Sequence, residues 1–373
     1  MPLELPHDEA RAWLALLRAP GLGAGGVREL VGRHGGASAA QAAAAREARV
    51  GAEARAWLAS PDAASIERDL AWLAAPDRHL IVATSEDFPA LLHDAANPPA
   101  ALCVAGDPAC LWTSQIAIVG ARSATAGGLA NARAFAKTLA QSGNTVTSGL
   151  AEGVDGAAHE GALEGGGTTI AVLGTGPDMV YPRQHRELAE RISAQGALVS
   201  EFPPGTPGRP ENFPRRNRII AGLSLGTLVV EASLNSGSLI TARLAAEIGR
   251  EVFALPGSIH SPLARGCHKL IRDGAKLVET ADEVLEELRG VGGLLAEGLR
   301  RRLHAPAAPA PVSDVAQRDP EYQRLLDALD AEPAALDELV ERTKLSAAAL
   351  SSMLLVLELD GAVAAENGRY ARR

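Results

Sequence analysis

Six short apolar segments, each ending in glycine or other small residues, constrain the fold of this chain more than any other feature. They cover residues 116–119, 145–147, 169–173, 198–200, 227–230 and 251–255. Stretches with helical patterns lie between several of them. Continuous apolar strands that alternate with helices are typical of a buried parallel sheet. We therefore predict an α/β domain with an extended Rossmann-like, doubly wound parallel sheet whose core spans residues 115–280.

A helical region precedes this domain. In residues 1–77, apolar side chains from Trp13 to Leu17 recur at helical spacing, and a glycine-rich turn over 20–26 leads into a second helix. The pattern resembles a SAM-like or helix-hairpin-helix domain. Such a hairpin can present backbone N–H groups to a DNA phosphate. Alternatively, its glycines simply turn the chain between two packed helices. We favour this alternative, because the segment has no excess of basic over acidic side chains.

The remaining segments complete the domain organisation. Residues 78–289 form the extended Rossmann-like domain, in which we expect 78–112 to be a connecting segment. Residues 290–318, rich in Gly and then in Ala and Pro, are predicted to be a linker. In residues 319–373, three helical patterns and a hairpin with an Asn-Gly turn predict a winged helix.

Composition excludes several classes of protein. No apolar stretch is long enough for a membrane helix, and the acidic N-terminus lacks the basic region of a signal peptide. Cys103, Cys110 and Cys267 form no disulfide or metal-binding pattern. We expect a cytoplasmic protein without a bound metal or other cofactor.

The charge distribution locates a binding region. The chain has a net charge of −9, yet residues 205–276 contain ten basic and five acidic side chains. We therefore expect a polyanion to bind this central segment.

The strand ends predict an anion site. Ligands of open α/β sheets bind beyond the carboxyl ends of the strands, and small residues there let a ligand approach the backbone and helix N-termini. The loops concerned are 120–123, 148–149, 174–176, 231–238 and 256–258, and Arg122 adds a positive charge. A phosphate group is the expected ligand.

Residues 209–218 extend this site. Arg209, Arg215, Arg216 and Arg218 lie close to Phe213 and Asn217. Guanidinium groups match phosphate geometry, and a phenyl ring can stack on a base. A salt-bridged helix start with Phe213 in the core is the alternative, although Glu211 is the only acidic residue within 205–226.

Catalytic signatures are weak. The chain has no P-loop and no His-Glu-x-x-His motif. Asp155 and His159 are four residues apart, so we expect them on one face of a helix. They could be an acid–base pair or metal ligands, but we favour a structural hydrogen-bonded pair. Gly226, Thr227 and Glu231 are similar to a pattern of nucleotide-processing Rossmann enzymes, which gives an alternative function resembling nucleoside monophosphate phosphoribohydrolase.

Taken together, these motifs resemble the DNA-processing protein A (DprA, or Smf) family. The matching stretches lie in the family's order at 119–122, 148–159, 171–176, 181–182, 200–205, 213–223, 229–232, 236–242, 256–258 and 266–271. The resemblance implies a non-catalytic protein of natural transformation that binds and protects incoming single-stranded DNA, loads the RecA recombinase and dimerises through its Rossmann-like domain.

The same resemblance implies the nucleic-acid-binding residues. Arg122 would bind a phosphate in a pocket shaped by neighbouring small residues, Phe213 would stack near a base, and Arg209 would replace a basic residue that relatives place nearer the phenylalanine. The full expected set is Gly120, Arg122, Ser123, Ser148, Gly149, Arg209, Phe213, Arg215, Arg216, Asn217, Arg218, Ser236, Gly237, Ser238 and Lys269.

The winged helix has a different charge pattern. Residues 319–373 contain eleven acidic and six basic side chains, and the third helix, 346–359, has no Arg or Lys. Recognition helices of winged helices use basic and polar side chains in the major groove. We therefore predict a protein contact or an accessory role for this domain.

Overall fold

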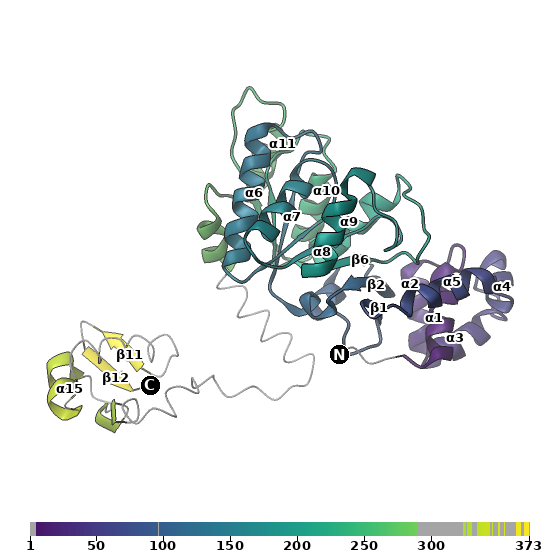
Figure 1. The fold of residues 1–373 in the computed structure, drawn as a ribbon, viewed down its shortest axis with the longest axis horizontal. Helices are drawn as coiled ribbons and strands as arrows, with labels where there is room; N and C mark the ends of the chain where they lie inside the picture. The colour runs from purple at the N-terminus through teal and green to yellow at the C-terminus, as the bar shows by residue number, and fades with distance from the viewer. Residues whose placement is uncertain are drawn as a thin grey trace. The chain divides into compact units, whose positions relative to one another are not determined.

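The computed structural model describes residues 5–95 and 97–288, and within the C-terminal region residues 324–325, 327–329, 334–343, 345, 350, 354, 363–366 and 369–372. The chain divides into two compact units, Met1–Ala296 and Glu297–Arg373 (Figure 1). Each unit is described by itself below.

A nine-stranded sheet forms the centre of the first unit, with the order β1-β2-β6-β5-β4-β3-β7-β8-β9. Its strands are β1 (Arg78–Val82), β2 (Ala101–Gly106), β3 (Gln115–Val119), β4 (Thr145–Ser148), β5 (Thr169–Val172), β6 (Ala197–Ser200), β7 (Gly226–Val229), β8 (Glu251–Ala254) and β9 (Lys276–Leu277). From β6 to β9 all pairs are parallel. This confirms the predicted Rossmann-like sheet, and the strand order reverses between β3 and β7.

Helices cover both faces of this sheet (Figure 1). Strand side chains alternate between faces, so in β3 Ile116 and Ile118 join one core cluster while Ala117 and Val119 join the other. The first face packs on α6 (Ala126–Gln141), α7 (Val154–Glu164), α8 (Arg186–Gln195) and helical residues 281–288. The second packs on α9 (Asn212–Leu223), α10 (Ser238–Glu247) and α11 (Arg265–Arg272).

The expectation that 78–112 is a connecting segment is wrong. It contains β1, β2 and the short helices η1 (Ala90–Asp94) and η2 (Pro108–Trp112). Strand β2 pairs antiparallel with both β1 and β6, which extends the parallel sheet by two strands. The apolar runs 80–82 and 101–105 are short, and prolines lie between them, so they resembled loop sequence.

Five helices form the N-terminal region: α1 (His7–Arg18), α2 (Gly23–His34), α3 (Ala37–Ala44), α4 (Ala52–Ala59) and α5 (Ala63–Leu73). The glycine-rich turn that leads from α1 into α2 contains Gly21 and ends at Gly23, the first residue of α2; their φ angles of 70° and 65° are a conformation that glycine adopts readily. Arg18 joins this region to the sheet domain. It binds Asp69 through two 2.6 Å contacts and the Pro204 carbonyl at 2.6 Å.

In the second unit, β10 (Ala334–Ala335), β12 (Arg369–Arg372) and β11 (Val363–Glu366) form a three-stranded sheet in that order. The helix α15 (Leu336–Thr343) corresponds to the second helix predicted for the winged helix. Leu325, Leu339, Leu350 and Leu354 share one core cluster. Most of the predicted third helix and the Asn367–Gly368 turn lie outside the described residues.

Across the described residues, no helix combines the length and apolar character that a membrane crossing requires.

Candidate nucleic-acid interface

A groove lies beyond the carboxyl ends of β3 and β7, where the strand order reverses. In doubly wound sheets this switch point is the usual ligand site. The groove has a volume of about 520 Å³, and we call it the strand-end groove. Its lining consists of Val119, Gly120, Ala121, Arg122, Ser123, Ala151, Asp155, Pro210, Phe213, Pro214, Arg216, Asn217, Ile220, Ser233, Ser236, Gly237, Ser238, Ile240, Thr241 and Leu263.

Glycines allow the loops around the groove to pack closely. A Cβ atom on Gly120 would lie 2.6 Å from the Val154 side chain and 3.0 Å from the Glu231 carbonyl. Gly153 has a φ of 80°, and a Cβ there would lie 2.3 Å from the Ala121 carbonyl. The loop after β3 therefore lies directly against the start of α7, and Arg122 is held at its tip.

Arg122 and Phe213 form the chemically distinctive pair of the groove. Arg122 is exposed, and its guanidinium carbon lies 5.8 Å from the centre of the Phe213 ring. Within the described part of the chain, no carboxylate forms an ion pair with Arg122. This arrangement leaves the guanidinium available to an anion while the ring supplies a flat apolar surface beside it.

The polar start of α10 forms another part of the lining. The hydroxyl oxygens of Ser236 and Ser238 lie 2.7 Å apart, and the Asn217 amide donates a hydrogen bond of 3.4 Å to the Gly237 carbonyl. A helix N-terminus presents backbone N–H groups and a partial positive charge. These N–H groups can therefore donate hydrogen bonds to a phosphate oxygen.

The floor of the groove contains two buried charged side chains, Asp155 and Arg216, which are held mainly by backbone groups. Asp155 accepts hydrogen bonds from the backbone N–H groups of Gly149 at 3.1 Å and Ala151 at 3.4 Å. Arg216 donates to the Gly149 carbonyl at 2.7 Å and to that of Val172. Burial raises the pKa of Asp155, although nearby Arg216 opposes the shift, and burial lowers the pKa of Arg216 to about 10.

The expectation that every arginine of 215–218 lines the groove needs correction. Arg215 and Arg218 both pair with Oε2 of buried Glu201, at 2.9 and 2.8 Å. Arg218 is itself buried, and neither residue is in the groove lining. A buried carboxylate requires compensating charge, and these two arginines on one side of α9 supply it.

Other predicted residues lie away from the groove. The Ser148 hydroxyl is buried and donates to the Ile118 carbonyl at 2.6 Å, and Gly149 lies beneath the floor against Arg216. Exposed Arg209 and Lys269 are not among the lining residues. Of the expected set, the groove itself contains Gly120, Arg122, Ser123, Phe213, Arg216, Asn217, Ser236, Gly237 and Ser238.

The candidate catalytic residues have structural contacts instead. Glu231 accepts hydrogen bonds from the Thr125 N–H at 2.9 Å and hydroxyl at 2.7 Å, at the start of α6. His159 is buried, and its Nδ1 lies 2.7 Å from the Thr169 hydroxyl. Burial lowers the pKa of His159 to about 3. Asp155 and His159 share a helix but bind different partners, so they are not an acid–base pair.

Two features of the site were not recognised in the sequence. Asp155 contributes to the groove floor, which its position one helical turn before His159 did not indicate. The exposed ring of Tyr181 lies 5.3 Å from the Phe213 ring, centre to centre. Only the short Tyr-Pro motif of the family resemblance marked this tyrosine.

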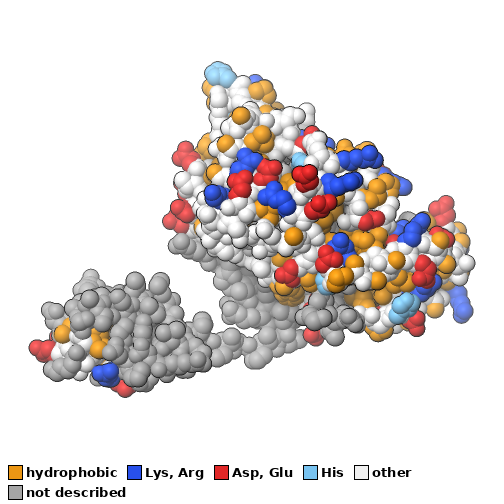
Figure 2. Space-filling view, viewed as in Figure 1, with side chains coloured by type: hydrophobic (Ala, Val, Ile, Leu, Met, Phe, Trp, Pro, Cys, Tyr) orange, Lys and Arg blue, Asp and Glu red, His pale blue; other side chains and the backbone are white. Residues whose placement is uncertain are grey.

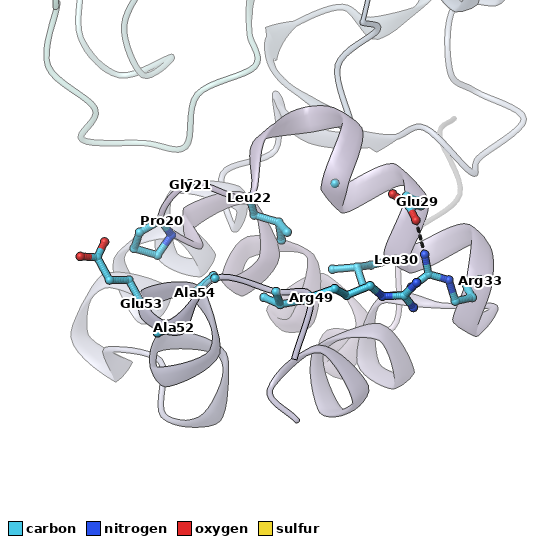
Figure 3. A pocket seen from close by; sticks show the side chains of 13 residues that line it. Pro20, Gly21, Leu22, Glu29, Leu30, Arg33, Arg49, Ala52, Glu53 and Ala54 are labelled. Carbon is cyan, nitrogen blue, oxygen red and sulfur yellow. Dashed lines mark hydrogen bonds and ion pairs between the residues drawn. The ribbon is translucent and has the colours of Figure 1, made fainter. Parts of the chain in front are cut away.

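The helical region contains a second hollow, of about 470 Å³, between α2 and the start of α4 (Figure 3). Glycines of the predicted hairpin line it, but its arginines are engaged. Arg33 pairs with Glu29 and with Glu47, and Arg49 pairs with Glu47 at 2.6 Å. Glu53 also lines the hollow. Its charges are balanced, which favours the interpretation of the hairpin as a turn between packed helices.

Comparison with known families and proteins agrees with this geometry. The model of the DNA recombination-mediator protein A family matches residues 79–289, and that of the DprA winged helix domain matches residues 304–369. Protein Smf of Escherichia coli strain K12 is 46% identical over 309 residues, which are 83% of this chain and 81% of that protein. DNA processing protein DprA of Bacillus subtilis is 43% identical over 224 residues, 60% of this chain and 75% of that protein.

Solved structures give the same result. The X-ray structure of DNA processing protein A from Streptococcus pneumoniae matches with a TM-score of 0.67 and 33% identity, over 74% of this chain and 97% of that one. A Helicobacter pylori DNA processing protein A, described by its single-stranded DNA binding mode, matches with a TM-score of 0.51 and 29% identity, over 55% of this chain and 94% of that one. This chain belongs to the DNA recombination-mediator protein A family.

Proposed function

We propose that this protein binds single-stranded DNA in the strand-end groove. The observation that carries the proposal is Arg122, a cation without an ion-pair partner among the described residues, held over the face of Phe213 at the switch point of the sheet. A single strand offers both a phosphate for the guanidinium and an unpaired base for the ring. The similarity to proteins named for DNA processing supports the same ligand.

Different parts of the groove lining contact different groups of the DNA strand. Arg122 and the start of α10, at Ser236–Ser238, hold a phosphate between them, while Gly120 and Ser123 let the strand approach the backbone. Phe213 stacks on a base, and Asn217 lies beside it. Arg209 and Lys269 lie outside the lining, and we assign them contacts with more distant phosphates, whereas Arg215 is held by Glu201. Stacking and phosphate contacts carry little sequence information, so we expect weak base preference.

We further propose that the bound strand is protected and passed to the RecA recombinase, in natural transformation. The family description as a recombination mediator supports this role. The protein would act by binding rather than by catalysis, because Glu231 is held by Thr125 and is not positioned as a catalytic carboxylate. We expect a cytoplasmic homodimer formed through the Rossmann-like domain, with the winged helix in an accessory role.

A salt series tests the DNA site. Fluorescence anisotropy with labelled oligo-dT should show binding by the wild-type protein that weakens as salt rises. Arg122→Gln should weaken binding and lower the slope of log K against log salt by about 0.7, the value for one lost single-strand phosphate contact. Arg191→Gln, which removes an exposed arginine of α8 outside the groove, is the matched control. Absence of wild-type binding would contradict the proposal.

An assay of RecA filament formation tests the proposed role in loading the recombinase. Filament formation on oligo-dT coated with single-strand-binding protein should start sooner when the wild-type protein is added, and Arg122→Gln should remove that gain. An unchanged lag with protein that still binds DNA would contradict RecA loading but leave the DNA site intact.

A further inference from the structure

A third hollow lies beside α8. It has a volume of about 680 Å³ and is bounded by the loop after β5, by α8 and by residues of β1, β2 and β6. We call it the α8 hollow. Residues 177–180, Arg183 and Arg186, on both sides of Tyr181 in the sequence, line this hollow, and the Tyr181 ring contacts Phe213 of the strand-end groove.

Tyr181 is placed as a second aromatic surface. Its side chain is 55% exposed, an unusual state for a large ring, and it contacts Phe213 with the two planes tilted by 45°. In the region that the structure describes, its hydroxyl forms no hydrogen bond. A Cβ built on Gly208 would lie 3.6 Å from Phe213 and 3.9 Å from Tyr181, so the loop at Gly208 packs beside both rings.

The arginines that follow Tyr181 also lack partners. Arg183 and Arg186 are exposed, they line the α8 hollow, and no ion pair links either to a described residue. The other charges of the hollow are largely engaged. Asp77 pairs with Arg78 at 2.5 Å, and Asp178 accepts a hydrogen bond of 2.7 Å from the Gly205 N–H. Glu190 is the carboxylate that remains to oppose the two arginines.

We propose that single-stranded DNA leaves the strand-end groove over Tyr181 and continues into the α8 hollow. Two successive bases stack on Phe213 and Tyr181, and Arg183 and Arg186 hold the phosphates that follow. Basic and acidic side chains are interleaved on the face that Figure 2 shows, over α7 to α10. Individual uncompensated arginines, rather than a broad basic patch, therefore mark the path of the strand. This inference rests on the proposed function and extends its footprint.

Stacking and phosphate contacts leave different signatures, which makes the path testable. Tyr181→Ala should weaken binding of a long oligo-dT on the order of tenfold, as loss of one stacked base does, and leave the salt slope unchanged. Tyr181→Phe should retain the wild-type affinity. The double variant Arg183→Gln/Arg186→Gln should lower the slope by about 1.4, since each lost phosphate contact contributes about 0.7. Glu190→Gln should strengthen binding, because it removes the opposing carboxylate.

A length series supplies the decisive readout. With oligo-dT from about 4 to about 16 nucleotides, a range of single-strand site sizes, wild-type affinity should rise until the strand reaches the α8 hollow. The Tyr181 and Arg183/Arg186 variants should match the wild type on the shortest oligonucleotides and lose only the gain from added length. Arg191→Gln is the control, because Arg191 lies on the same helix but outside the hollow.

The outcomes separate this inference from the proposed function. If Arg122→Gln and Phe213→Ala weaken binding while the Tyr181 and Arg183/Arg186 variants behave like the wild type at every length, the path over Tyr181 is wrong and the groove site stands. If the wild-type protein binds no oligo-dT, the proposed function itself fails. Circular dichroism of each variant confirms folding, and these surface residues lie outside the core clusters.

Discussion

Two neighbouring regions of this protein each place an arginine over a phenylalanine, with opposite consequences. In the strand-end groove, Arg122 lies 5.8 Å from the Phe213 ring without an ion-pair partner among described residues. In the cluster around Glu201, Arg215 lies 5.3 Å from the Phe202 ring and binds the buried carboxylate together with Arg218. The comparison shows that the carboxylate, and not the arginine or the ring, decides whether such a pair binds a ligand or supports the fold.

The buried floor of the groove should give the largest effect. Arg216→Met removes a buried cation, leaves the Gly149 and Val172 carbonyls without their donor and takes a positive charge from the surroundings of buried Asp155. Each buried acceptor left unsatisfied costs about 1–3 kcal/mol, so the two carbonyls together should cost about 2–6 kcal/mol of stability. Urea unfolding should show this loss, and Arg191→Met should leave the unfolding curve unchanged. Stability within about 0.5 kcal/mol of wild type would contradict the structural role.

Substitution of Phe202 should mainly reduce stability, whereas substitution of Phe213 should mainly reduce DNA binding. Phe202 is buried, so Phe202→Ala should cost about 3–5 kcal/mol of unfolding free energy. Phe213 is only partly buried, and Phe213→Ala should instead weaken oligo-dT binding by about 1–3 kcal/mol with an unchanged salt slope. Phe213→Trp, which keeps a stacking surface, should bind well. Equal losses of stability from both alanine variants would abolish the contrast.

The pH dependence of the unfolding free energy tests a contact of the buried interior, His159, independently of the groove. The pKa of His159 is about 3 in the folded protein against an ordinary value of 6.5, so the unfolded state binds more protons between these values. His159 therefore contributes stability that is present above about pH 6.5 and lost as pH falls toward 3. We expect a loss of about 2 kcal/mol between about pH 7 and about pH 5.

The control for this titration is His159→Asn, whose amide can still donate to the Thr169 hydroxyl. This variant should lose that part of the pH dependence, whereas substitution of exposed His260 by Asn should not. An identical pH dependence in wild type and His159→Asn would show that His159 is not the source.

The smallest expected effect concerns Arg215. It is paired with Glu201, so Arg215→Gln should change oligo-dT affinity by less than about 1 kcal/mol, as for a partly exposed ion pair. Glu201→Gln should release Arg215 and steepen the salt slope by up to about 0.7. Anisotropy titrations of both variants measure this. A loss from Arg215→Gln as large as that from Arg122→Gln would place Arg215 in the groove after all.

The parallel sheet was predictable because its strands are buried on both faces and are therefore continuous apolar runs. The location of the groove at the carboxyl ends of the strands followed from the same pattern, whereas the strand order that makes it a switch point did not. Strands β1 and β2 were not predicted, because their short runs lie beside Pro89 and Pro98–Pro99. The composition of a segment also does not reveal where its side chains point. Residues 215–218 are consecutive, yet Glu201, a partner from a separate strand end, turns Arg215 and Arg218 away from Arg216 and the groove.

Photocrosslinking tests the central claim most directly. Oligo-dT carrying 5-iodouracil is crosslinked to the wild-type protein, and the modified peptides are identified by mass spectrometry. We predict a crosslink at Phe213, with Arg122→Gln reducing its yield and Arg191→Gln leaving it unchanged. Crosslinks confined to the helical region, α1 to α5, or to the winged helix domain would contradict the strand-end groove as the site of single-stranded DNA binding.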